Sequence, residues 1–329
     1  RGKLPLDEPR KRKIERYANI KSDCVISAPD VIGKETANTI YVVPLNLEKD
    51  NFGEKLLTRL RLSKRKEPNW DSWAEMVRRP TNPDGEISIA LVGKYLGIGD
   101  FQLTDSYLSV AAALSHAGAA LNTKVNIHWI NSKDIESWNV DLSSYDGIIV
   151  PGGFGSSGVE GKILAIEYAR KNNLPYLGLC YGLQMAVIEF ARNVCDLNAN
   201  TTEVNPETPH GVVDILPEQL EIENKGGTMR LGAYPALLRP GSRIESIYGT
   251  DKVSERHRHR YEVNPEYHKI LEEKGLVISG KSPDGRLAEF IEIPGHKFFI
   301  ATQAHPEFKS YPMKPSPLFY SFVKACMGG

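Results

Sequence analysis

The stretch Leu177-Gly178-Leu179-Cys180-Tyr181-Gly182-Leu183-Gln184 joins an apolar run to a helical pattern. The apolar run, 174–179, predicts a buried strand, and the pattern from Gly182 to about Arg192 predicts a helix. Cys180 stands at the junction, with one glycine two residues before it and another two residues after it. Glycines in these positions suit the sharp turn of a nucleophile elbow, here with cysteine in place of serine. The helix N-terminus that follows favours negative charge, and therefore a thiolate.

A second segment, Gln303-Ala304-His305-Pro306-Glu307, contains the groups that a cysteine nucleophile needs. It follows another apolar run, 297–302. His305 can take the proton of Cys180, and the Glu307 carboxylate can orient the imidazole. Taken alone, a cysteine after an apolar run is more often a packed core residue, and a single His-x-Glu pair usually has no function. The two patterns together predict that Cys180, His305 and Glu307 are catalytic.

Length and composition narrow the class of protein. The 329 residues suffice for one large domain with additional material or for two domains. Because 41 basic residues balance 41 acidic ones, the net charge is zero, and non-specific nucleic-acid binding is not expected. Four cysteines without paired spacing, no secretory signal and no apolar stretch of membrane-spanning length indicate a cytoplasmic protein that does not enter a membrane. The chain starts without methionine, at Arg1, so we expect the middle of a longer protein.

The order of apolar and helical segments favours an α/β fold. From Ile87 onward strands alternate with helices, which predicts a doubly wound, mostly parallel sheet. Residues 63–86 have the charged, Pro- and Asn-containing composition of an interdomain linker, and residues 1–62 mix a basic helical stretch with short apolar runs. We expect strands at 87–92, 124–129, 147–150, 175–179, 288–293 and 298–302, and helices at 104–120, 159–172, 182–192, 265–273 and 317–325. Sites in such sheets form at the carboxyl ends of strands, where Cys180 and His305 would lie.

Several segments spread along the chain give it a specific likeness. They are Ile89–Tyr95, Thr104–Tyr107, Val150–Gly155, Gly226–Gly232, Glu255–Asn264 and the two segments quoted above. With them the sequence resembles the class I, triad-type glutamine amidotransferases, and among these the glutaminase half of the CTP synthases. The resemblance implies a flavodoxin-like amidotransferase domain over residues 87–329. It also implies that residues 1–62 are a small α/β remnant from the end of an amidoligase domain, with the 63–86 linker between the two.

The resemblance also implies a role for each site residue. Cys180 would attack the amide carbon of L-glutamine, His305 would carry its proton to the departing ammonia, and Glu307 would orient His305. Backbone N–H groups of Gly153 and Tyr181 would form the oxyanion hole. The implied glutamine-binding residues are Gly153, Tyr181, Gln184, Glu203, Arg260 and Tyr261. Among these, Arg260 would grip the substrate carboxylate and Glu203 its ammonium group. From composition alone, residues 256–260 could instead be a solvated basic loop or a phosphate-binding patch.

Nucleotides and partners are likewise implied by the resemblance. An amidoligase domain would use ATP and Mg²⁺ to aminate UTP to CTP with the released ammonia, GTP would act as allosteric effector, and the intact enzyme would be a homotetramer. Lys13 matches a position near the pyrimidine nucleotide, and Asp30 and Val31 match positions near the ATP base; ordinary surface roles are the alternative. Arg230 belongs to a loop involved in the GTP effect. The glutaminase domain itself would bind no cofactor, and the histidines and cysteines show no metal-site spacing.

Two departures from the family pattern and two other functions remain open. Tyr181 and Leu183 stand where the family usually carries leucine and methionine, and the loop 96–103 is longer than usual. Backbone roles survive such side-chain changes, so the mechanism is unaffected by the first departure. The chain could alternatively be an amidotransferase subunit for another acceptor, or a catalytically silent regulatory or assembly module.

Overall fold

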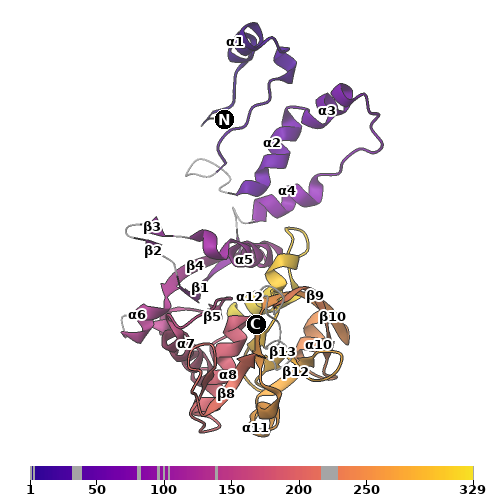
Figure 1. The fold of residues 1–329 in the computed structure, drawn as a ribbon. Coiled ribbons are helices and arrows are strands. Elements are labelled where there is room, and N and C mark those ends of the chain that lie inside the picture. The colour runs from indigo at the N-terminus through magenta and orange to yellow at the C-terminus, as the bar shows by residue number, and fades with distance from the viewer. Residues whose placement is uncertain are drawn as a thin grey trace. The chain divides into compact units, whose positions relative to one another are not determined.

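The computed structural model describes residues 2, 4–31, 39–79, 83–94, 97–98, 101–102, 104–137, 140–215 and 229–328. The chain divides into two compact units, Arg1–Asp84 and Gly85–Gly329 (Figure 1). The second unit starts two residues before the predicted beginning of the amidotransferase domain, residue 87. The assignment of the first unit to an amidoligase domain and a linker stays a prediction. No helix in the described ranges is long and apolar enough to cross a membrane.

The first unit is helical where the structure describes it. Its helices are α1 (Glu8–Ala18), α2 (Val43–Lys49), α3 (Phe52–Leu60) and α4 (Asp71–Arg78), with short 3₁₀ turns at Ser22–Cys24 and Ile40–Val42. Of the predicted α/β remnant, the described residues of this segment therefore show the helices. Their β pairing is an isolated bridge between Gly2 and Pro29. The Thr39 hydroxyl accepts from the Tyr41 N–H, and a proline opens α2. These helix-start signals outweigh the strand propensity of the apolar residues around Tyr41.

The second unit is built on a nine-stranded sheet with two halves. One half is parallel, as predicted, and contains β4 (Thr123–Asn131), β1 (Gly85–Gly93), β5 (Gly147–Val150), β6 (Tyr176–Leu179) and β14 (Phe299–Thr302), in that order. The other half, here called the antiparallel wing, contains β13 (Ala288–Glu292), β12 (Val277–Lys281), β9 (Arg230–Leu238) and β10 (Lys252–His259). The prediction of a mostly parallel sheet is thus correct for the parallel half. The strand β14 pairs with both halves and is here called the seam.

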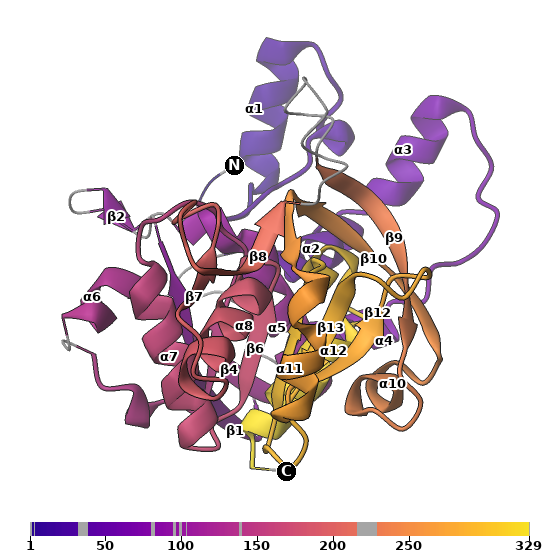
Figure 2. The same ribbon diagram turned by 60° about the horizontal axis from the view of Figure 1, so that its bottom comes forward.

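Helices cover both faces of the parallel half, which confirms the doubly wound α/β prediction. Successive residues of β5 point to opposite faces: Ile148 and Val150 pack with α7 (Val159–Lys171) and α8 (Tyr181–Asn193), and Ile149 packs with α5 (Leu108–Ala120) and α12 (Pro317–Cys326). The neighbouring positions of α7 and α8 are visible in Figure 2. Strands buried on both faces explain the continuous apolar runs in the sequence.

Smaller elements surround this frame. Short helices are α6 (Ser132–Glu136), α10 (Arg243–Tyr248) and α11 (His268–Glu273), and 3₁₀ turns occur at Thr104–Tyr107, Leu142–Ser144, Pro265–Tyr267 and Pro306–Lys309. A second sheet consists of β11 (Tyr261–Val263), β8 (His210–Ile215) and β7 (Ala199–Thr201). The loop predicted to be longer than usual contains the hairpin of β2 (Gly97–Ile98) and β3 (Phe101–Gln102).

Candidate active site

Cys180 occupies a strained turn between β6 and α8. Its φ is 51° and its ψ is −98°, a left-handed conformation that costs an L-residue about 1–3 kcal/mol. Backbone hydrogen bonds hold it there: the Cys180 N–H donates to the Thr302 carbonyl at 2.7 Å, and the Cys180 carbonyl accepts from Leu183 and Gln184. The elbow predicted from the sequence is present, and its strained residue is Cys180 itself.

The two glycines of the elbow are required for space rather than for φ. A Cβ on Gly178 would lie 2.7 Å from the Ala301 Cβ, and a Cβ on Gly182 would lie 2.1 Å from the Val150 carbonyl oxygen. Neither glycine has a positive φ. They let β6 and the first turn of α8 approach the neighbouring strands, which places the Cys180 sulfur at the carboxyl edge of the sheet.

His305 and Glu307 follow β14, the strand next to β6 on the same edge. The His305 Nδ1 lies 2.7 Å from the Glu307 Oε1, and the His305 N–H donates to the Arg256 carbonyl at 2.7 Å. Burial lowers the pKa of His305, but its hydrogen bonds with Cys180 and Glu307 and their negative charges outweigh burial and raise the pKa to about 10. The surroundings therefore favour an imidazolium beside Cys180.

A cavity of about 530 Å³ brings the predicted residues together. Of the predicted catalytic and glutamine-binding residues, it is lined by Cys180, His305, Glu307, Gly153, Gln184, Glu203, Arg260 and Tyr261. The side chain of Tyr181 does not line it: the ring is buried, and its hydroxyl donates to the Gly155 carbonyl at 2.7 Å. The Tyr181 side chain therefore does not take part in lining the cavity, and the role of its backbone N–H in an oxyanion hole stays a prediction.

The 151–155 loop beside the cysteine is fixed from two sides. The Gly155 N–H donates to the Glu203 carboxylate at 2.9 Å, while the Gly155 carbonyl accepts from Tyr181. Burial, followed by the charge of Glu203, raises the pKa of the Tyr181 hydroxyl, so this group remains a donor. The loop is thus held with the Gly153 backbone next to the Tyr181 ring, where a Gly153 Cβ would lie 3.4 Å from the ring.

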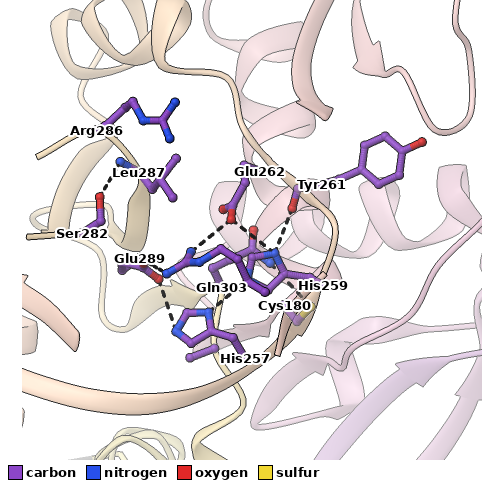
Figure 3. A network of polar contacts seen from close by, with 12 residues as sticks. Cys180, His257, His259, Tyr261, Glu262, Ser282, Arg286, Leu287, Glu289 and Gln303 are labelled. Atoms are coloured by element: carbon purple, nitrogen blue, oxygen red, sulfur yellow. Dashed lines mark hydrogen bonds and ion pairs between the residues drawn. The ribbon is translucent and has the colours of Figure 1, made fainter. Parts of the chain in front are cut away.

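Gln303 is a site residue that the sequence reasoning missed. It is fully buried, and its Nε2 donates to the Cys180 sulfur at 3.5 Å. Its Oε1 accepts from Gln184 at 3.3 Å, and Gln184 also donates to the Tyr261 carbonyl at 2.9 Å. Figure 3 shows Gln303, Cys180 and Tyr261 close together. The available signal was a polar side chain directly after the apolar strand β14, one residue before the Ala304-His305 pair.

Arg230 lies in a buried ion-pair cluster. Its Nη1 donates to Glu262 at 3.0 Å and its Nη2 to Glu289 at 2.7 Å, so its guanidinium is committed to structural contacts. Residues 226–228 of the predicted effector loop lie outside the described residues. A part of Arg230 in a GTP effect stays a prediction.

The other predicted nucleotide residues belong to the first unit. Lys13, on α1, helps to line a hollow of about 570 Å³ with Arg12 and Arg16, and the Asp30 N–H donates to the Gly2 carbonyl at 2.9 Å. Val31 lies directly after Asp30 in an irregular segment. In the part of the chain that the structure describes, no group of three or more His, Cys, Asp or Glu side chains could hold a metal.

Comparison with known proteins gives a consistent result. The model of the family described as "Glutamine amidotransferase class-I" matches residues 102–325. The chain is 55% identical over 337 residues to the CTP synthase of Methanocaldococcus jannaschii and 53% identical over 333 residues to that of Methanococcus maripaludis. These alignments cover 100% and 99% of this chain, which spans 60% of the length of each relative.

A solved structure supports the same grouping. The glutaminase domain of Trypanosoma brucei CTPS, with bound acivicin, is 41% identical to the chain, with a TM-score of 0.67, and the match covers 74% of this chain and 94% of that one. The chain therefore belongs to the class-I glutamine amidotransferase family, and within that family to the group formed by the CTP synthases and their glutaminase domain.

Proposed function

We propose that the second unit hydrolyses L-glutamine to glutamate and ammonia through Cys180, His305 and Glu307. The observation that carries the proposal is the His305–Glu307 pair facing a cysteine on a strained elbow inside one cavity. The Cys180 thiolate attacks the amide carbon, and His305 donates its proton to the departing ammonia as the C–N bond breaks. Water then attacks the thioester and gives a proton to His305, which releases glutamate and regenerates the thiolate.

Charge develops on the former amide oxygen in both steps. Gly153, three residues after β5, lines the cavity together with Cys180, and Tyr181 begins α8 directly after Cys180, so their N–H groups are the donors we assign to this oxyanion. One such donor is worth about 3 kcal/mol in related acyl-transfer chemistry. The side-chain N–H of Gln303 on the sulfur adds a donor that favours the thiolate before attack.

Substrate recognition is assigned to Arg260 and Glu203, which line the same cavity. Replacing Arg260 with alanine should raise the KM for glutamine about 10- to 100-fold, as expected for loss of a charged hydrogen bond, while kcat changes less. Steady-state kinetics would measure both constants. Arg256→Ala is the matched control, because the exposed Arg256 serves His305 through its backbone carbonyl alone. An unchanged KM in Arg260→Ala would contradict the assignment.

The His305 environment sets the pH range of activity. Because its pKa is raised from 6.5 to about 10, the charged ring stabilises the fold fully below pH 6.5, and that stabilisation is lost as the pH rises through about 10. The imidazolium that protonates the leaving amide nitrogen, so that it departs as ammonia, is lost over the same interval. We expect kcat/KM to stay level from about pH 7 to 9 and to fall above it. Circular dichroism at each pH would control for unfolding, and an alkaline limb centred near pH 7 would contradict this prediction.

For the complete protein we propose synthesis of CTP from UTP, because the relatives that match the whole chain are CTP synthases. An amidoligase domain would bind ATP, Mg²⁺ and UTP, with Lys13, Asp30 and Val31 as its contribution from this chain. GTP would act as effector through the Arg230 side of the site, and the protein would be a cytoplasmic homotetramer. The free cysteines at 24, 180, 195 and 326 are consistent with a reducing compartment.

The decisive experiment follows glutamate release from glutamine by the full chain, with and without GTP. Release that disappears in Cys180→Ala supports the proposed glutaminase. Capture of the ammonia that depends on UTP, once the amidoligase half is supplied, supports CTP formation; release without such capture would indicate another acceptor. Failure of a glutamine-analogue electrophile to label Cys180 in the folded protein would indicate a silent module.

A further inference from the structure

Five buried polar residues next to the cavity, of which His259 also lines it, have no part in the hydrolysis steps proposed above. We call them the histidine cluster: Arg230 on β9, His257 and His259 on β10, Glu262 on β11 and Glu289 on β13. Their side chains expose between 1% and 13% of their surface. Figure 3 shows the two histidines between Glu289 and the Tyr261 carbonyl. Buried polar groups require hydrogen-bond partners, so the position of each hydrogen in the cluster follows from the donor or acceptor beside it.

His259 is the cluster residue nearest the active site, and its contacts determine which atoms donate in the hydrogen bonds of the cluster. Its Nδ1 lies 3.1 Å from the Tyr261 carbonyl oxygen, which can only accept, and 3.5 Å from the Glu262 carboxylate. Nδ1 therefore carries the hydrogen. Burial, and then the charges of His257 and Arg230, lower the pKa of His259, so the ring is neutral and its Nε2 is a bare acceptor.

His257 must then donate to that acceptor. Its Nδ1 lies 3.0 Å from the His259 Nε2, so the hydrogen between the rings belongs to His257. Burial, and then the charges of Arg230 and His305, lower the pKa of His257 to about 3, which keeps this ring neutral as well. Its Nε2 is consequently bare, and it faces the Glu289 Oε2 at 3.5 Å.

The bare Nε2 of His257 and the Oε2 of Glu289 would both be hydrogen-bond acceptors, and they would repel each other unless Glu289 carries a proton. Its Oε1 accepts from Arg230, and its Oε2 has no hydrogen-bond partner among the described residues. Glu262 and Glu289 share the one guanidinium of Arg230, and burial raises the pKa of both carboxyls. Arg230 is the cation that donates to both carboxyls, and burial disfavours two ionised carboxylates beside it, so we assign one proton to the pair. The bare nitrogen of His257 places that proton on the Glu289 Oε2.

The position of the proton on Glu289 rests on geometry. Burial raises the pKa of Glu289 and raises that of Glu262 to about 8, and each carboxyl has one oxygen without a hydrogen-bond partner among the described residues. Of these two oxygens, the Glu289 Oε2 is the one that lies beside the bare Nε2 of His257, at 3.5 Å. The Tyr234 ring packs edge-to-face with His257 at 5.5 Å between centroids.

We propose that Glu289, His257 and His259 form a one-directional hydrogen-bond relay that positions the amides next to the catalytic sulfur. A neutral Glu289 donates to His257, His257 donates to His259, and His259 donates to the Tyr261 carbonyl. These three are positioning residues, and the inference rests on the proposed role of Cys180.

Two glutamines, Gln184 and Gln303, connect the relay to the Cys180 sulfur. The Tyr261 carbonyl accepts hydrogen bonds from His259 and from the Gln184 Nε2. The Gln184 Nε2 also donates to the Gln303 Oε1. Gln303 must therefore turn its Nε2 hydrogens toward Cys180. A reversed relay would leave the Tyr261 carbonyl facing a bare nitrogen, which would repel it and remove the anchor that orients Gln184.

Histidine tautomers test the relay without any assay of activity. In the full chain labelled with ¹⁵N-histidine, long-range ¹⁵N–¹H correlations should show both rings neutral with hydrogen on Nδ1, unchanged between pH 6 and 9. The assignment uses the single variants His257→Gln and His259→Gln. Hydrogen on Nε2 of either ring, or titration of either ring near pH 6.5, would overturn the inference.

Variants of Glu289 connect the relay to catalysis. Glu289→Gln keeps an acceptor for Arg230 and a permanent donor for His257, so kcat/KM should stay within about threefold of wild type. Glu289→Met removes the donor and should lower kcat/KM roughly tenfold or more and shift the tautomer signals. The matched control is Glu292→Gln, a buried carboxylate on the same strand that caps α10, which should leave the tautomers unchanged. Wild-type kcat/KM in a folded Glu289→Met, or a Glu289→Gln as impaired as Glu289→Met, would overturn the relay. Absence of Cys180-dependent hydrolysis in wild type would refute the proposed function instead, with the tautomer result unaffected.

Discussion

Replacing Cys180 with alanine should lower glutamine hydrolysis about 10⁴-fold or more, the scale of loss seen when a nucleophile is removed from a triad. No other group in the cavity holds the same place, because the elbow projects one side chain toward His305 and Gln303. Alanine keeps a Cβ and can take the same backbone conformation, with the Thr302, Leu183 and Gln184 hydrogen bonds unchanged. Glutamate release under saturating glutamine measures the effect, and the thermal unfolding temperature shows that the fold survives.

Cys195→Ala is the matched control, since Cys195 is another buried cysteine, packed in the core beside α8 and away from the cavity. It should retain activity close to that of wild type. Hydrolysis in Cys180→Ala at more than a small fraction of the wild-type rate would remove the proposed nucleophile. An inactive and unfolded variant would be distinguished by the loss of its unfolding transition.

A second large effect is expected for Gly182→Ala, this time on stability. The added Cβ would lie 2.1 Å from the Val150 carbonyl oxygen and 3.1 Å from its carbon, and backbone atoms of a central strand cannot move aside like a flexible side chain. Overpacking of this kind costs roughly 3 kcal/mol, which lowers Tm by about 6–12 °C for a domain of this size. Calorimetry or circular dichroism would measure the change.

Gly85→Ala provides the comparison for that measurement. Gly85 begins β1, and a Cβ there would meet nothing within 4 Å. Its Tm should therefore stay near that of wild type. Equal Tm values for the two variants would show that the contact between α8 and β5 yields more readily than the structure implies, and that the second glycine of the elbow is not needed for space.

The parallel half of the sheet was predictable because its strands are buried on both faces. The 147–150 strand was predicted with the bounds observed for β5, and 298–302 differs from β14 by one residue. Continuous apolar runs identify such strands directly. The meeting of Cys180 and His305 at one edge of the sheet was predictable for the same reason, since each residue follows one of these runs.

Of the antiparallel wing, the sequence predicted β13, as the 288–293 strand, but not β9, β10 or β12. The strand β10 escaped prediction because most of its inward positions are polar. Burial alternates residue by residue along β10, but three of the buried positions are Glu255, His257 and His259. Apolar alternation, the usual sign of a half-buried strand, is therefore missing. In β9 a proline at position 235 and a glycine at 232 weaken the strand signal further. The segment that resembled a solvated basic run is thus a strand with two arginines outside and two histidines inside.

Gln303 and the histidine cluster could not be found from spacing for a related reason. Their contacts join β9, β10, β11, β13 and the end of β14, which are brought together by strand pairing distant in sequence. A local pattern carries no information on such pairings. The resemblance assigned Arg230 to an effector loop, whereas the structure shows the two carboxylates that hold its side chain.

The residues of the proposed site come from both sides of the seam at β14. The parallel half alone would present Cys180 on its elbow, but the backbone of His305 is fastened to Arg256 on β10, the outermost strand of the wing. Arg260, proposed to grip the substrate, follows that same strand. A chain in which only the parallel half has formed would hold Cys180 on its elbow without the backbone contact that anchors His305, so the outermost strand of the wing completes the proposed site.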